Sequence, residues 1–336
     1  MPRLLTVDDL RLELPGESGP LRPVDGVSFH VDVGECVGLV GESGCGKSLS
    51  ALTLLGLTRE LPRVKITGST ELASKDTDPV DLLKLSEHEL THVRGGEVAM
   101  VFQDPLSALN PLLKIDYQIG EVLRRHRGLT GNEAFADTVE LLASVGVPQP
   151  EQRARQYPHQ LSGGLRQRAL IALSLAGEPS LLIADEPTTA LDVTVQAQIL
   201  MELKTLRERR GLSILFITHD LGVVAQLCTR VLVMYAGRIV EEAPVDEFFG
   251  GPRHPYSKGL LGSLPTMTDG RAELTSIPGN PPRPGHFPPG CRFEPRCPVA
   301  IERCGSDYPA LVADRERRCA CHVTQPELEP VGDGPG

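Results

Sequence analysis

GESGCGKS, residues 41–48, is the stretch of this chain that most directly indicates a fold class. It follows the apolar run ECVGLV and precedes SLSALTLLG, so its glycines stand between a predicted strand and a predicted helix. That is the position of a phosphate-binding loop, in which backbone N–H groups and a helix N-terminus attract the anionic phosphates of a nucleotide. The stretch therefore predicts a nucleotide site.

Each residue type in this loop has an expected task. Lys47 would reach the β- and γ-phosphates of ATP, and Ser48 would bind Mg²⁺. The Cys45 thiol is interpreted as filling space and receives no chemical role. The backbone groups expected to surround the phosphates belong to Gly41, Ser43, Gly44, Cys45 and Gly46.

A second motif, LLIADEP at residues 181–187, is an apolar strand that ends in two carboxylates. Open α/β sheets place their ligand chemistry at such strand ends. Asp185 is expected to hold Mg²⁺, and Glu186 to polarise the water that attacks ATP. Paired with the loop upstream, the two acids predict a nucleotide-hydrolysing site.

The pattern along the chain favours an α/β fold with a mostly parallel, buried sheet. Short strand-like runs alternate with longer helical stretches. The strand-like runs are ECVGLVG, VAMVFQ, LLIADE, SILFITHD and RVLVMYAG. Residues 1–250 are predicted as one ATPase domain, with a helical insertion at about 105–161. From residue 251 to 336 the Pro- and Gly-rich text SIPGNPPRPGHFPPG and a group of cysteines predict a separate extension.

LSGGLRQR, residues 161–168, places Ser162 and two glycines before a helical run, which is a second helix N-terminus open to an anion. VFQDP contains Gln103, TALD contains Asp192 and ITHD contains His219. In this order the motifs resemble those of the ATP-binding subunits of ABC transporters. The resemblance implies a P-loop nucleotide-binding domain with a RecA-like core, an antiparallel β subdomain and a helical insertion.

The resemblance also implies a head-to-tail dimer, in which the Lys47 loop of one subunit and the segment Ser162, Gly163 and Gly164 of the other enclose each ATP. Gln103 would bind Mg²⁺ and sense the γ-phosphate, and Asp192 would link the two sites. His219 would hold the attacking water in line with Glu186. These roles come from the resemblance.

Further segments are similar to the ATPase subunits of oligopeptide, dipeptide and nickel importers, and in particular to the D-type subunit of a heterodimeric pair. They are ADEPTTALDVTVQAQIL, MYAGRIVE, HPYSKGLLGSLP and GCRFEPRCP. The implied partners are a second ATP-binding subunit, two transmembrane permeases and, indirectly, an extracytoplasmic substrate-binding protein. The implied location is the cytoplasmic face of the membrane, with peptides as substrate and nickel or another small solute as the alternative.

Composition bears on other classes of function. The net charge of −10 and the lack of a long Lys/Arg run argue against a nucleic-acid partner. No apolar run reaches the roughly 18 residues of a membrane span, and the start MPRLLTVDDLRLELPG lacks the apolar core of a signal peptide, so a cytosolic chain is expected. A soluble ABC ATPase of DNA repair stays an alternative, whereas a non-hydrolysing nucleotide-gated module would lack Glu186 or His219.

Five of the eight cysteines fall between residues 291 and 321, in the spacing C-x5-C-x6-C-x14-C-x-C. A reducing compartment favours metal over disulfides, and wide spacing suits a bulky iron–sulfur cubane better than Zn²⁺. The family pattern ends in Cys-His, which selects Cys321 over Cys319. The resemblance thus implies a [4Fe–4S] cluster, with zinc or unmetallated core thiols as alternatives. The predicted ligands are Cys291, Cys297, Cys304 and Cys321.

The adenine contact is the point at which the sequence departs from the family. Relatives often stack an aromatic side chain on adenine, but residues 1–28 contain no Phe, Tyr or Trp. Leu21 or Arg22 is the expected substitute.

Overall fold

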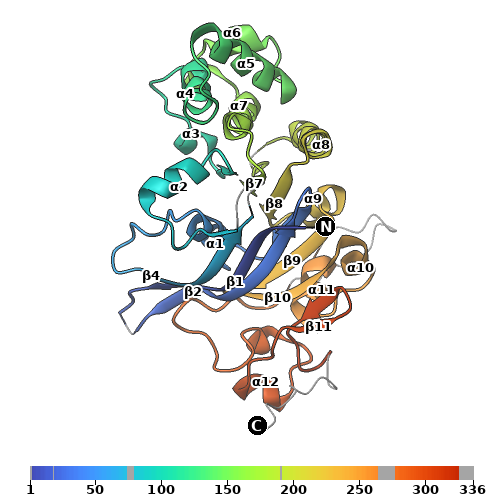
Figure 1. The fold of residues 1–336 in the computed structure, drawn as a ribbon. Helices are drawn as coiled ribbons and strands as arrows, with labels where there is room; N and C mark the ends of the chain where they lie inside the picture. Colours follow the sequence, from blue (N-terminus) through green and yellow to red (C-terminus); the bar gives the residue numbers. More distant parts are fainter. Residues whose placement is uncertain (1, 18, 74–78, 190, 264–276, 325–336) are drawn as a thin grey trace, which may run out of the picture.

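The computed structural model of this chain is built on two β-sheets with helices packed around them (Figure 1). It describes residues 2–17, 19–73, 79–189, 191–263 and 277–324. Within these ranges no helix combines the length and the apolar character needed to cross a membrane.

The larger sheet has eight strands in the order β11-β12-β10-β9-β3-β8-β7-β6. The five strands from β9 to β6 are parallel, and they are the five apolar runs predicted from the sequence. Almost every residue in them is buried, as expected of a sheet covered on both faces. Their bounds are β3 Cys36–Val40, β6 Val98–Val101, β7 Leu181–Asp185, β8 Ser213–Thr218 and β9 Arg230–Tyr235.

The register of these strands brings their carboxyl ends to one level. Val40 at the end of β3 lies opposite Thr218 at the end of β8, and Asp185 at the end of β7 lies opposite Ile217. The residues that follow each strand therefore meet at one edge of the sheet, where ligands of open α/β sheets bind.

A smaller antiparallel sheet, in the order β2-β1-β4-β5, packs against one face of the larger one. Leu10 and Leu12 of β1 and Leu39 of β3 belong to the core between the two sheets, which also contains the apolar side of α1. The bounds are β1 Arg3–Leu14, β2 Leu21–Asp32, β4 Lys65–Leu72, β5 Val80–Asp81 and α1 Lys47–Leu54.

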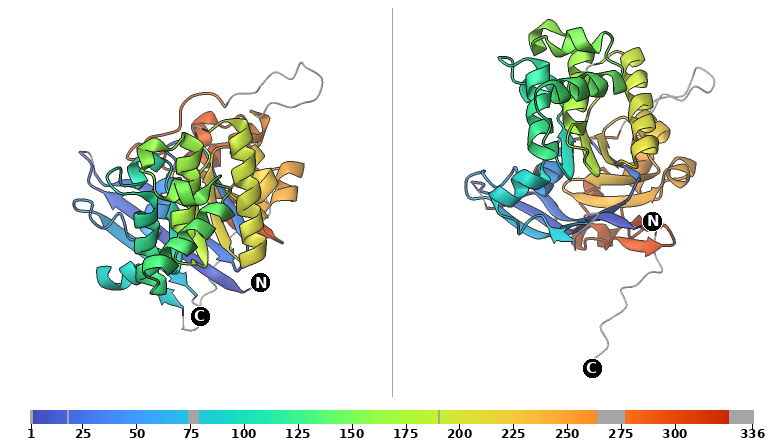
Figure 2. Two further views of the ribbon diagram at one scale, coloured as in Figure 1. Left: turned by 90° about the horizontal axis from the view of Figure 1, so that it is seen from above. Right: turned by 45° about the horizontal axis from the view of Figure 1, so that its top comes forward.

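Helices cover the other face of the larger sheet. The segment from α3 to α6 (residues 105–154), called the helical group below, lies toward the end of the molecule opposite the chain's last segments (Figures 1 and 2). In α4 the buried residues Ile115, Ile119 and Leu123 recur every four positions, which gives the helix one apolar side, and Gly128 ends it with a left-handed φ of 69°. The bounds are α2 Glu87–Val93, α3 Pro105–Ala108, α4 Ile115–Arg127, α5 Gly131–Ser144, α6 Pro150–Ala154, α7 Gly163–Leu175, α8 Val193–Arg210, α9 Leu221–Leu227, α10 Val245–Gly250 and α11 Pro255–Gly262.

The segments after α11 return to the larger sheet. Strand β12 (Arg317–Cys319) pairs antiparallel with β10 (Arg238–Pro244), and β11 (Val312–Asp314) pairs with β12. The chain beyond residue 251, which the sequence sets apart as an extension, thus contributes two strands to the sheet of the ATPase domain; residues 264–276 and 325–336 lie outside the described residues. Two short helices complete this region, η2 (Glu294–Arg296) and α12 (Glu302–Ser306).

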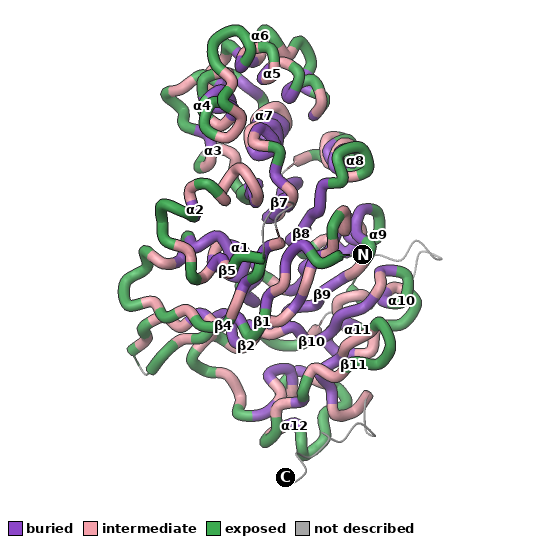
Figure 3. The backbone as a smooth tube through the Cα atoms, viewed as in Figure 1, coloured by how far each residue is buried: buried purple, intermediate pink, exposed green. Residues whose placement is uncertain are grey.

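One core joins this C-terminal region, hereafter the tail (residues 277–324), to the rest of the chain. Phe293 is 2% exposed and lies with its ring centroid 5.3 Å from that of Tyr235 on β9 and 5.4 Å from that of Tyr256 on α11. Figure 3 shows where the buried residues lie: the strands of the larger sheet are mostly buried, whereas the outer helices are largely exposed. The tail has no separate core around Phe293, because its apolar side chains enter the large one.

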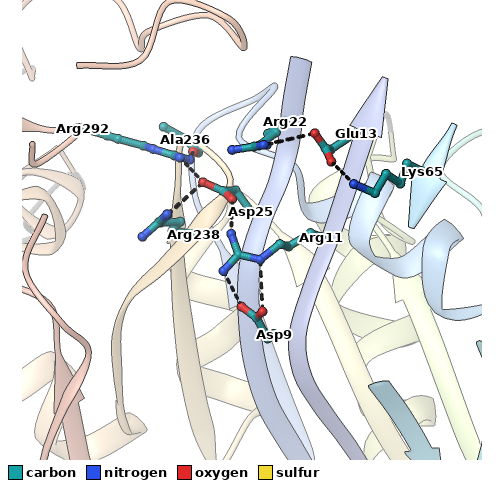
Figure 4. A network of polar contacts seen from close by, with 9 residues as sticks. All are labelled: Asp9, Arg11, Glu13, Arg22, Asp25, Lys65, Ala236, Arg238 and Arg292. Carbon is teal, nitrogen blue, oxygen red and sulfur yellow. Dashed lines mark hydrogen bonds and ion pairs between the residues drawn. The ribbon is translucent and has the colours of Figure 1, made fainter. Parts of the chain in front are cut away.

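A buried carboxylate ties three parts of the chain together (Figure 4). Asp25 on β2 accepts hydrogen bonds from Arg11 on β1, Arg238 on β10 and Arg292 in the tail. Arg292 also donates to the carbonyl of Ala236 in the β9–β10 turn. Burial of Asp25 disfavours its charged form, but the arginines outweigh that cost and hold its pKa below the usual range.

Candidate functional site

The phosphate-binding loop runs from the end of β3 to the start of α1, where the sequence places it. Its glycines adopt backbone conformations that other residues avoid. Gly46 has a φ of 109°, and a Cβ there would lie 2.4 Å from the carbonyl oxygen of Pro23. A Cβ on Gly41 would lie 2.2 Å from the carbonyl oxygen of Met234. Both positions require glycine because the backbone of neighbouring segments approaches too closely for any side chain.

Lys47 is buried and spans this loop from within. Its Nζ donates to the carbonyl oxygens of Gly41 at 2.8 Å and Glu42 at 3.0 Å. The ammonium group therefore already lies among the backbone groups that form the loop. The thiol of Cys45 is also buried, and burial raises its pKa, so it is a neutral space-filling group, as the sequence suggested.

The two acids at the end of β7 lie beside the loop. The Ser48 hydroxyl donates to Oδ1 of Asp185 at 3.0 Å, so two of the three predicted Mg²⁺ ligands are in contact. Burial raises the pKa of Asp185, and the hydrogen bond from Ser48 opposes this effect. A carboxylate and a hydroxyl oxygen side by side are donors of the kind that Mg²⁺ prefers, so these residues fit the ion.

Glu186 is the centre of a small polar network. Its carboxylate contacts Nδ1 of His219 at 3.0 Å, and accepts from Nε2 of Gln103 at 3.1 Å and from the Thr189 hydroxyl at 2.9 Å. Its backbone has a left-handed φ of 46°, which is uncommon for a residue with a side chain. The segments that follow three neighbouring strands, β6, β7 and β8, therefore meet at this one carboxylate.

The environment keeps Glu186 ionised. Burial alone would raise its pKa, but the hydrogen bonds from His219 and Thr189 outweigh burial and hold the pKa below the usual range. An ionised carboxylate fixed by three partners is suited to orient and polarise a water molecule. The contact of Thr189 with Glu186 was not predicted from the sequence. The available signal is that Thr189 lies three residues after Glu186, in DEPTT.

The second helix start lies at the N-terminus of α7. Ser162 caps this helix by accepting from the N–H of Leu165, and Asp192 caps α8 by accepting from the N–H of Val195. A Cβ on Gly164 would lie 3.0 Å from Val195, so the two helix starts are neighbours. Among the described residues, no hydrogen bond connects Ser162, Gly163 or Gly164 to the loop at residues 41–48. The segment and the loop are thus separate features of one subunit.

Comparisons with known proteins agree with this geometry. The ABC transporter family model matches residues 24–189. The Bacillus subtilis oligopeptide transport ATP-binding protein AppD is 47% identical over 318 residues, which are 95% of this chain and 95% of AppD. The chain belongs to the family of ABC transporter ATP-binding proteins. A second model, for the C-terminal region of oligopeptide/dipeptide transporters, matches residues 240–304.

Solved structures of ABC proteins share the fold. The dimeric ATP-binding cassette MJ0796, in a post-hydrolysis state bound to ADP and Pi, is 28% identical with a TM-score of 0.64, over 72% of this chain and 99% of that one. CbiO1 of Clostridium perfringens, part of the ABC transporter complex cbiONQ, is 25% identical with a TM-score of 0.61, over 74% and 92% of the two chains. These comparisons confirm the predicted ABC ATPase fold with its mixed α/β sheets.

The positions expected to contact adenine lie at the start of β2. Arg22 donates to the Glu13 carboxylate at 3.2 Å (Figure 4). Leu21 adjoins Gly285 of the tail, where a Cβ would lie 2.6 Å from the leucine Cδ2. A tail segment therefore runs beside one of the two residues that the sequence predicts to contact adenine.

Two of the predicted cluster ligands are in backbone contact in the tail, where the Cys291 N–H donates to the carbonyl oxygen of Cys304 at 2.8 Å. Burial raises the pKa of Cys291 to about 11, and the neighbouring Cys304, Cys321 and Cys297 add to the effect. Cys319 lies apart from this set, on β12, with Sγ 3.6 Å from the Thr324 hydroxyl. Within the described part of the chain, however, no three His, Cys, Asp or Glu side chains are arranged to hold a metal ion. The metal centre predicted from the sequence is not confirmed.

Proposed function

We propose that this chain is the ATP-hydrolysing subunit of a membrane importer for peptides. The observation that carries the proposal is the arrangement around Glu186, whose ionised carboxylate lies one residue after the predicted Mg²⁺ ligand Asp185 and is fixed by His219 and Gln103. The match of residues 240–304 to the C-terminal region of oligopeptide/dipeptide transporters and the likeness to AppD favour peptides over nickel, and transport over DNA repair.

In the proposed reaction, Glu186 orients and polarises a water molecule for attack on the γ-phosphate of ATP. His219 holds the water bound by Glu186 in line with the γ-phosphate. Gln103 contacts the γ-phosphate and couples its presence to the position of the helical group. Lys47 neutralises phosphate charge within the loop. Mg²⁺ bound by Ser48 and Asp185, with Gln103 as a further ligand, would neutralise the charge that develops on the phosphate oxygens.

The active form is proposed to be a head-to-tail dimer with a second ATP-binding subunit. The N-terminus of α7 is open, because a Cβ on Gly163 would meet nothing within 4 Å, and Gly163 follows the cap residue Ser162. An uncovered helix N-terminus attracts anions, so the Ser162–Gly164 segment is suited to close over ATP on the partner's loop. Asp192, whose helix start adjoins Gly164, would then connect the two sites.

The helical group is proposed to dock on two transmembrane permeases at the cytoplasmic face of the membrane, while an extracytoplasmic binding protein delivers the peptide. Two apolar side chains support this placement. Leu112 is 81% exposed and Tyr117 is 47% exposed, and both belong to the helical group, far from the tail (Figure 1). Contact surfaces between proteins contain exposed apolar side chains, so these two residues are candidates for the permease contact.

For the tail we propose that Cys291, Cys297, Cys304 and Cys321 hold a [4Fe–4S] cluster. The mutual influence of these thiols supports a shared site. Protein purified without exposure to air should contain about four irons per chain and lose them in Cys297→Ser. Equimolar zinc without iron, or no metal at all, would contradict the cluster.

The transport function is tested by deleting the gene in its host and measuring uptake. Loss of labelled peptide uptake, restored by the wild-type gene but not by Glu186→Gln, is the expected result. Loss of nickel uptake with normal peptide uptake would replace the substrate. Normal uptake of both, with sensitivity to DNA damage, would remove the chain from import altogether.

A further inference from the structure

Glu42, a residue of the phosphate-binding loop, is held by side chains that lie outside the nucleotide-binding motifs. The Glu42 N–H donates to the Tyr256 hydroxyl at 2.8 Å, and its carbonyl oxygen accepts from Lys47 at 3.0 Å. Its carboxylate is gripped by Arg296 of the tail through two parallel bonds, Nη1 to Oε2 at 2.7 Å and Nη2 to Oε1 at 3.0 Å. The backbone and the side chain of this one loop residue are thus all fixed by neighbours.

Arg296 is a buried residue, and each of its donors is in use. The side chain is 5% exposed. Besides the two bonds to Glu42, Nε donates to the carbonyl of Pro278 at 2.8 Å, Nη1 to the Tyr235 hydroxyl at 3.2 Å and Nη2 to the carbonyl of Gly279 at 3.3 Å. A guanidinium has five N–H donors, so these five bonds leave none for a phosphate. The direct hydrogen bonds of Arg296 to the phosphate-binding loop are those to Glu42.

Two physical consequences follow from this pair. A bidentate Arg–carboxylate pair fixes orientation as well as distance, so it holds the start of the loop, between Gly41 and Ser43, in one shape. It also neutralises the Glu42 carboxylate, which would otherwise add negative charge to a loop that receives a triphosphate. Both consequences favour ATP binding.

We propose that Arg296 is a positioning residue for the phosphate-binding loop and that, through Glu42, the folded tail sets the affinity of this chain for ATP. The inference rests on the proposed function in one respect, namely that the loop binds ATP. It assigns to the tail an effect on the nucleotide that is independent of whether the cysteines hold a metal.

The test compares binding of a non-hydrolysable ATP analogue with Mg²⁺ to full-length variants by titration calorimetry, alongside thermal unfolding of each. Arg296→Gln should bind about tenfold more weakly than the wild type. Arg296→Lys, which keeps the charge but not the two parallel bonds, should lie between them. Arg303→Gln is the matched control, because Arg303 lies in the same tail, is 58% exposed and pairs with Asp307 at 3.0 Å; its affinity should equal that of the wild type.

A double variant separates positioning from general loss of stability. Glu42→Gln added to Arg296→Gln removes the unpaired carboxylate, so the double variant should bind no more weakly than Arg296→Gln. A double variant that binds the ATP analogue more weakly than Arg296→Gln would overturn the proposal. Wild-type affinity in Arg296→Gln and Arg296→Lys would also overturn it, and should Arg296→Gln fail to fold, Arg296→Lys decides alone. Failure of the wild type itself to bind the analogue would instead refute the ATP-binding assignment.

Discussion

Replacing Phe293 with alanine tests whether the tail and the ATPase domain form one folding unit. The ring is 2% exposed and packs between Tyr235 on the larger sheet and Tyr256 on α11. Truncating a buried Phe to Ala costs about 3–5 kcal/mol, because transfer energy is lost and a cavity remains. Since its neighbours belong to the sheet and to the helix that supports Glu42, the cavity should destabilise the whole chain.

The assay is urea unfolding followed by circular dichroism. With an m-value of about 3 kcal/mol/M, a loss of about 3 kcal/mol lowers the midpoint by about 1 M. Val299→Ala is the control, because Val299 lies in the same tail but is 47% exposed, and its midpoint should change little.

If Phe293→Ala makes the tail sensitive to protease while the main unfolding transition keeps its midpoint, the tail is an independent appendage. The shared core would then contribute nothing to the stability of the ATPase domain.

Three further outcomes are expected. Glu186→Gln should lower ATP hydrolysis by the assembled transporter at least about 100-fold while ATP binding stays intact, and near-normal turnover would place the base elsewhere. Lys47→Ala should weaken ATP binding about tenfold or more, measured by calorimetry, because a charged phosphate partner is lost; unchanged affinity would contradict the loop assignment. His254 is fully buried, which lowers its pKa to about 3, and its Nδ1 accepts from the N–H of Tyr256 at α11. Between about pH 6.5 and pH 3 the unfolded chain holds a proton on this histidine that the folded chain lacks, so the wild type should lose up to about 1.4 kcal/mol of stability per pH unit as the pH falls. His254→Asn keeps an acceptor for the helix cap but does not titrate, so its free energy of unfolding should depend less on pH, by the contribution of one bound proton. If urea unfolding gives the same pH dependence for this variant and the wild type, His254 does not cause that dependence.

The phosphate-binding-type loop and the acidic strand end, and their position beside one another, could be predicted from the sequence because these signals are local. Strand β3 and its glycine loop are contiguous, and Asp185 and Glu186 directly follow an apolar strand. Parallel pairing then brings these strand ends together without further information. Gln103 and His219 were placed by family order, and the structure brings both to Glu186.

The role of the tail was not predictable in the same way. Strand β12 has the sequence RRC and β11 has VAD, which are too short and too polar to give an alternating pattern. The contacts of Arg292 with Asp25 and of Arg296 with Glu42 span 267 and 254 residues of sequence. No periodicity in a single sequence reports a pair of charges so far apart. Residues 277–290 of the Pro- and Gly-rich stretch precede β11 and β12, which join the larger sheet, and the domain boundary near residue 250 stays a prediction.

The late return of β12 also affects how the chain folds during synthesis. Until Arg317–Cys319 has left the ribosome, β10 forms an open edge of the larger sheet, with backbone groups free to pair with another chain. Glu241 and Glu242 on that edge are buried in the finished protein, where they pair with Arg317 and Arg318. Before Arg317 and Arg318 are present, Glu241 lacks its arginine partner and Glu242 keeps only Arg230. Charged side chains on an edge strand oppose aggregation. The same residues that fasten the last strand thus protect the unfinished sheet before that strand arrives.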